Sequence, residues 1–166
     1  LWSFTSSDVA RHFGWSENQT DLLLANPISA DLDVMRPSLL PNLSTAAGRN
    51  NDRGYGDVAL FETGLRFLST KPDGQLPTVG GVRMGSIQPR HWAGGARPVD
   101  AFDAKSDALA ALEAFGAPVD NLMTDTRAIP EWFHPGRSGT LGLGKNILAV
   151  FGELHPKVLR TLGIKG

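Results

Sequence analysis

The stretch that decides the fold runs from Asn26 to Leu43 and reads NPISADLDVMRPSLLPNL. A short apolar run, Leu22-Leu23-Leu24, leads into it. Pro27 biases the residue before it toward extended backbone rather than helix. We therefore expect a strand over residues 22–24 that ends at Asn26-Pro27.

A helix is predicted directly after this break. Ser38 is the expected N-cap, and Pro41 falls inside the first helical turn, where the amide that it lacks would have no partner within the helix. Beyond Ser38 the apolar residues recur at steps of three and four, so they share one helix face. With the methionine that precedes the cap, the apolar stripe comprises Met35, Leu39, Leu40, Leu43, Ala46 and Ala47.

The rest of the chain mixes strand and helix patterns without strict alternation. We expect a strand over 57–68 with a possible bulge at Gly64, a turn at 71–74 and a mobile loop over 48–56. Such a mixture predicts an α+β fold in which an antiparallel sheet is flanked by helices. The other predicted elements are helices over 6–13, from Phe102 with Asp103 as cap to Gly116, and over 156–162, and strands over 77–86, 140–144 and 147–151. In the second of these helices Leu109, Leu112 and Phe115 share one face, and Pro135-Gly136 predicts a turn.

Composition limits the chain to one ordinary globular domain over residues 1–166. It has 41% hydrophobic and 20% charged residues and a formal net charge of -1. No segment has the roughly 18 consecutive apolar residues of a membrane span. Because cysteine is absent, disulfides and thiolate metal sites are excluded. The start at Leu1, without a signal peptide, leads us to expect a fragment of a larger cytoplasmic protein.

Five blocks, in this order, carry a resemblance to a known family: NPISADLDVMRPSLLPNL (26–43), LFETG (60–64), FDAKSDALAALEAFG (102–116), HPGRSG (134–139) and FGELHPKVL (151–159). Together they resemble the catalytic-like domain of the beta subunit of bacterial phenylalanyl-tRNA synthetase. The resemblance implies the fold of a class II aminoacyl-tRNA synthetase catalytic domain, here without activity. It also implies an alpha subunit that charges tRNA with phenylalanine using ATP and magnesium, in an alpha2-beta2 heterotetramer in the cytoplasm.

The chain lacks the residues that class II chemistry uses. Amino-acid activation needs arginines near the ATP phosphates and carboxylates for magnesium. The strand over 57–68 carries Glu62 and Arg66 without the family arrangement, and no arginine follows the glycines of 139–151 before Arg160. We therefore assign no catalytic, cofactor-binding or metal-binding residue, and we predict that this part of the protein is inactive by itself.

Two alternative functions remain open. Gly139 to Lys145 matches the GxxxxGK portion of a phosphate-binding loop, which would make the chain a nucleotide-binding enzyme, but Asn146 replaces the magnesium-ligating Ser or Thr and a strand follows. The second alternative is an RNA-binding module centred on the segment from Arg83 to Arg97, which also contains Arg90 and Trp92.

The leading hypothesis is a noncatalytic scaffold that assembles with the alpha subunit. In class II synthetases the first motif, a helix followed by a strand, forms the subunit interface, and Ser38 to Arg53 with the strand from Asp57 occupy that place here. The apolar stripe of Met35, Leu39, Leu40, Leu43, Ala46 and Ala47 is the candidate interface. The alternative for this stripe is a helix that packs on its own sheet.

Overall fold

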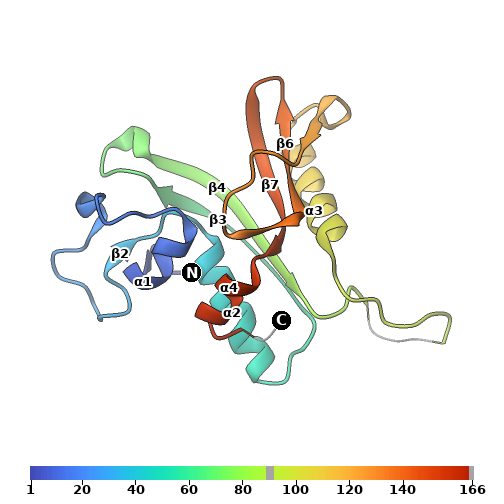
Figure 1. Ribbon diagram of the computed structural model, residues 1–166, viewed down its shortest axis with the longest axis horizontal. Coiled ribbons are helices and arrows are strands. Elements are labelled where there is room, and N and C mark those ends of the chain that lie inside the picture. Colours follow the sequence, from blue (N-terminus) through green and yellow to red (C-terminus); the bar gives the residue numbers. More distant parts are fainter. Residues whose placement is uncertain (89–91, 165–166) are drawn as a thin grey trace.

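The computed structural model describes residues 1–88 and 92–164 and is an α+β structure of helices and small antiparallel sheets (Figure 1). This confirms the α+β class that the sequence predicts. In the described residues the expected sheet is divided into three, whose strands are β1 (Phe4–Thr5) with β2 (Val34–Met35), β3 (Val58–Phe67) with β4 (Gln75–Met84), and β5 (Met123–Asp125) with β6 (Phe133–Leu143) and β7 (Asn146–Leu154).

The longest feature is the ribbon formed by β3 and β4. Its register is continuous from Val58 opposite Met84 to Phe67 opposite Gln75. The predicted strands and the turn between them, a 3-10 turn (Pro72–Gly74), are confirmed. The predicted bulge at Gly64 is wrong, since the unbroken ladder pairs this residue with Thr78.

Helix α2 (Leu40–Asp52) covers one face of the ribbon. Ser38 Oγ accepts a hydrogen bond from Leu40 N at 3.2 Å, but the N-cap is Leu39, so the helix begins one residue later than predicted. The predicted mobile loop over 48–56 is wrong in its first half, because the helix continues through Asp52. The Asn50 side chain supports this last turn by donating to Ala46 O at 2.8 Å.

The N-terminal part packs over one end of the ribbon. It contains α1 (Ser7–Ala10), which continues as a 3-10 turn (Arg11–Phe13), so the predicted helix over 6–13 is confirmed. The predicted strand over 22–24 is wrong: a 3-10 turn (Thr20–Leu22) brings Leu22 into the core, and Leu23 forms only an isolated bridge to Val34. The core cluster here consists of Ala10, Trp15, Leu22, Val34 and Phe67.

Helix α3 (Ala101–Ala114) packs against β7 and begins earlier than predicted. Asp100 is the cap, because its carboxylate accepts from Phe102 N at 2.8 Å and from Asp103 N at 3.1 Å. Asp103 reciprocates by accepting from Asp100 N at 2.9 Å, which completes a capping box. Phe115, predicted on the packed face, lies beyond the helix and is exposed.

The last part of the chain contains the C-terminal sheet. A 3-10 turn (Val119–Asn121) precedes β5, and helix α4 (Pro156–Thr161) follows β7. The predicted strands over 140–144 and 147–151 and the last helix are confirmed. The predicted turn at Pro135-Gly136 lies inside β6 instead. A register shift between Phe133 and Ser138 absorbs the irregular residues, and the Ser138 hydroxyl donates to His134 O at 2.5 Å across the bulge.

Candidate assembly surface

The two faces of the β3–β4 ribbon differ in chemistry and in cover. Side chains alternate along a strand, so β3 residues of even number share the inner face toward α2. Gly80 of β4 lies on this face, and a Cβ added there would be 3.0 Å from Leu39 Cβ and 3.3 Å from Leu43 Cδ1. The absence of a side chain at Gly80 thus lets the helix approach the ribbon closely.

The opposite face of the ribbon carries exposed apolar side chains, while Arg83 at its far end pairs with Asp107 of α3. Phe61 is 80% exposed, and Leu65 and Val79 are each 38% exposed. The ladder places Leu65 opposite Pro77, so the four side chains lie on one side of the two strands. We call the set Phe61, Leu65, Pro77 and Val79 the outer ribbon face. Exposed apolar surface of this kind is typical of an interaction site.

The structure divides the apolar stripe predicted from the sequence. Three side chains, those of Leu39, Leu43 and Ala47, are at most 4% exposed and are buried inside this chain. At these three positions the helix therefore packs on its own sheet. Met35, Leu40 and Ala46 are half-buried and reach the surface. The outer ribbon face was not predicted from the sequence, because both faces of β3 carry apolar residues. The glycines Gly64 and Gly80 could have identified the inner face, since they leave room for a covering element.

Beneath the ribbon lies a buried ion pair between two of the sequence blocks. Arg36, which is 2% exposed, donates from Nη1 to Glu62 Oε1 at 2.9 Å and from Nε to Leu65 O at 2.9 Å. The Glu62 carboxylate is therefore already engaged by a guanidinium. Arg66 Nε, on the same side of β3, is buried and has no hydrogen-bond acceptor in the described residues.

The segment from Arg83 to Arg97 does not present free arginines in its described part. Arg83 donates to Asp107 through Nε and Nη2 at 2.5 and 2.9 Å. Arg97 donates to Asp103 at 2.7 and 3.0 Å, and this hydrogen bonding raises the pKa of Arg97 and lowers that of Asp103. Trp92 is fully exposed, while Arg90 lies outside the described residues. Paired arginines have less charge available for phosphates.

The glycine segment from Gly139 to Lys145 is part of a β-hairpin. Residues 139–143 pair with β7, and Gly144 and Lys145 form the two-residue loop between the strands. A phosphate-binding loop instead directs free amides at the start of a helix toward the ligand. This geometry does not support the nucleotide-binding enzyme at this segment. Among the residues that the structure describes, no group of three His, Asp or Glu side chains could hold a metal ion.

Comparison with known sequences decides the family. A family model described as the phenylalanyl tRNA synthetase beta chain CLM domain matches residues 1–166. The chain belongs to this family. It is also similar to two proteins named phenylalanine--tRNA ligase beta subunit: it is 54% identical over 165 residues to that of Rhodospirillum rubrum and 53% identical over 170 residues to that of Brucella suis biovar 1. Each match covers 99% of this chain but only 20% and 21% of the relative.

The chain thus spans about a fifth of the length of these phenylalanine--tRNA ligase beta subunits. Within that fifth, blocks that carried the resemblance meet in space. Arg36 from the first block bonds Glu62 from LFETG, and Leu39 and Leu43 from the first block contact Gly80 on the paired strand. None of the described helices is long and apolar enough to cross a membrane.

Proposed function

We propose that the chain is a noncatalytic assembly domain of phenylalanine--tRNA ligase, with the fold of a class II synthetase catalytic domain. The chemistry, ATP- and magnesium-dependent charging of tRNA with phenylalanine, takes place on an alpha subunit. The complete enzyme is an alpha2-beta2 heterotetramer in the cytoplasm. The family, together with the order of α2, β3 and the antiparallel β4, supports this proposal.

The observation that carries the assembly role is the outer ribbon face. Phe61 would bury most of its ring only against another surface, and removal of apolar area from water is the main favourable term in stable association. The side chains sit on two ten-residue strands whose other face is fixed by α2. A partner would therefore meet a preformed surface and lose little entropy in ordering it.

This surface continues to part of the predicted stripe. Phe67 lies on the same side of β3 as Phe61 and Leu65, and it lines a groove of about 240 Å³ together with Leu24 and Met35. The groove thus lies at the end of β3 beyond the outer ribbon face, and we call the two together the apolar track. We propose that the alpha subunit covers this track, with Leu40 and Ala46 as further candidate contacts.

The noncatalytic part of the proposal rests on where the charged groups of β3 lie. A magnesium ligand or an ATP-binding arginine must have free atoms at the surface. Glu62 is instead bonded to the buried Arg36, and Arg66 Nε is itself buried. The strand that would carry this chemistry uses its charged side chains inside the fold.

Phenylalanine-dependent exchange between ATP and pyrophosphate tests this proposal. Full-length beta subunit alone should give no exchange above background, whereas the complex with the alpha subunit should be active. Lys145→Ala in the complex should leave the KM for ATP unchanged, since Lys145 lies in a hairpin loop. Exchange by the beta subunit alone, abolished by Lys145→Ala, would reject the proposal in favour of the nucleotide-binding enzyme.

A further inference from the structure

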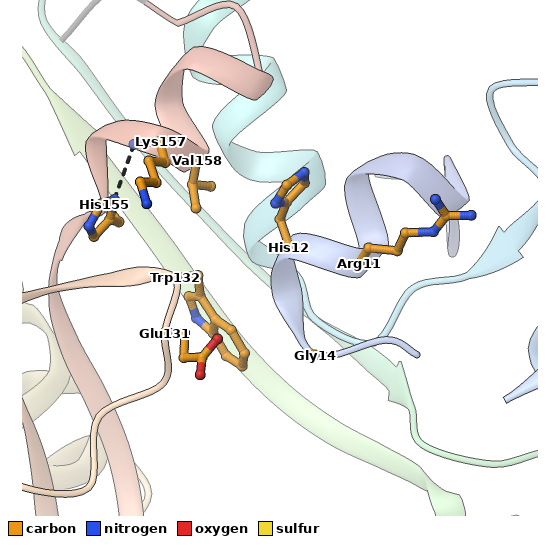
Figure 2. Close-up of a pocket in the computed structure, with 8 residues that line it drawn as sticks. All are labelled: Arg11, His12, Gly14, Glu131, Trp132, His155, Lys157 and Val158. Atoms are coloured by element: carbon orange, nitrogen blue, oxygen red, sulfur yellow. Dashed lines mark hydrogen bonds between the residues drawn. The ribbon is translucent and has the colours of Figure 1, made fainter. Parts of the chain in front are cut away.

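A second feature, which shares no residue with the outer ribbon face, is an open pocket of about 500 Å³. Three parts of the chain that are distant in sequence form it: the 3-10 turn after α1, the segment before β6, and the start of α4. Figure 2 shows His12, Trp132 and Lys157 around the same space, with Glu131 beside the indole ring.

Two opposite charges line this pocket without pairing. Lys157 and Glu131 form no ion pair with each other or with any other described residue. Arg11 differs, since its side chain points away from the pocket in Figure 2 and pairs with Asp8 at 3.6 Å and with Glu17 at 3.1 Å. The pocket therefore offers one available cation and one available anion at separate places.

The remaining polar groups are mainly donors. His155 Nδ1 accepts a hydrogen bond from Lys157 N at 3.1 Å, so the proton of the neutral ring is on Nε2, which is then a donor. The imidazole of His12 makes no hydrogen bond with the described residues. Together with the Lys157 ammonium, these groups suit the oxygens of an anion such as phosphate.

Trp132 supplies a fixed aromatic ring. Its indole lies 6.0 Å from the ring of the buried Phe13, measured between centroids. Gly14, at a φ of 91°, lies so close to the indole that an added Cβ would be 3.3 Å from two atoms of its six-membered ring. These contacts hold the indole in place, and a planar ligand could stack on it without first ordering it.

We propose that this pocket binds one nucleotide whose base carries an exocyclic amino group. The base stacks on Trp132 and its amino group donates to Glu131, while the phosphate accepts from Lys157 with help from His12 and His155. A ligand with a donor at one end, an acceptor at the other and a flat ring between them satisfies both unpaired charges. A uridine nucleotide lacks this amino group and has only the ring N3–H as a donor on its base.

Photochemical crosslinking in the complete ligase tests the site, because the adduct is located by mass spectrometry and is separated from any nucleotide bound elsewhere. With a photoactivatable azido-adenylate we expect adducts on peptides that contain Trp132 or Lys157. Charge-assisted bonds and base stacking are each worth about tenfold in affinity. Lys157→Ala and Trp132→Leu should therefore each lower the adduct yield about tenfold.

Substitutions at two exposed positions should leave the fold intact and so separate binding from folding. Glu131→Gln should reduce the preference for adenylate over uridylate as competitor, and Lys145→Ala, a matched lysine outside the pocket, should change nothing. Competition by adenylate and by a short oligoadenylate identifies the source: stronger competition by the strand indicates RNA, and equal competition a free nucleotide. Absence of adducts at these peptides, or a yield that Lys157→Ala leaves unchanged, would overturn the proposal.

Discussion

Gly80 and Leu39 are in such close contact that a Cβ at Gly80 would lie 3.0 Å from Leu39 Cβ. This contact joins β4 to the start of α2 on the face of the ribbon that the helix covers. A larger residue must displace the helix, and overpacking of a well-packed core costs about 1–3 kcal/mol. Gly80→Val should therefore lower the free energy of unfolding by about this amount in chemical denaturation.

The control is Gly81→Val on the neighbouring residue. Gly81 faces away from α2, and a Cβ there would make only ordinary contacts, 3.4 Å from Leu60 O and 3.8 Å from Phe61 Cβ. Valine is favoured in strands, so this variant should keep its stability. Equal loss in both variants would contradict the packing described for Gly80.

The ion pair of Arg36 and Glu62 gives a second prediction. Glu62→Ala would leave the guanidinium of Arg36, which is 2% exposed, without its charge partner. Removing one partner of a buried pair typically costs about 3–5 kcal/mol. Denaturant titration of this variant and of Glu153→Ala measures the difference. Glu153 pairs with the half-exposed Arg137, a contact worth about 1 kcal/mol or less. Similar losses in the two variants would be inconsistent with a buried pair.

The carboxyl group of Asp125 gives a prediction on pH. Hydrogen bonds from the Arg127 side chain, at 2.8 and 3.1 Å, and from its backbone amide lower the pKa of Asp125 from 3.8 to about 2. Because the pKa is depressed in the folded state, its contribution to stability is present above pH 3.8 and is lost as the pH falls through about 2. NMR titration of Asp125 should show this midpoint, and Arg127→Gln should move it up toward 3.8. An identical midpoint in both proteins would refute the assignment.

Sequence periodicity was sufficient to predict most helices and strands, but not which face of each element is buried. The alternation in residues 57–68 predicted β3, and Ser38 with Pro41 predicted the start of α2 to within one residue. The chain itself could not reveal that Leu39, Leu43 and Ala47 pack internally, because an apolar helix stripe looks the same against its own sheet and against a partner. Only the long-range contacts of the folded chain distinguish these two arrangements.

The failures at residues 22–24 and at Pro135-Gly136 have related causes. A run of three leucines favours a strand, but burial of Leu22 in the N-terminal core turns the backbone into a 3-10 helix. Pro135-Gly136 favours a turn, but β7 pairs on either side and incorporates the pair as a bulge. The pocket around Trp132 was also unpredictable, since His12, Glu131 and Lys157 meet only through the tertiary fold.

The central claim is that the outer ribbon face binds the alpha subunit. Its most direct test is co-purification of tagged alpha subunit with a full-length beta subunit that carries Phe61→Ser and Val79→Ser. Both side chains are exposed, so the thermal unfolding temperature should be unchanged, while loss of an apolar anchor commonly weakens association about tenfold or more. A matched control, Met123→Ser with Ile147→Ser, removes two exposed apolar side chains from the C-terminal sheet and should assemble normally. We predict that the ribbon variant folds but loses the alpha subunit, whereas an intact complex at wild-type affinity would contradict the proposed interface.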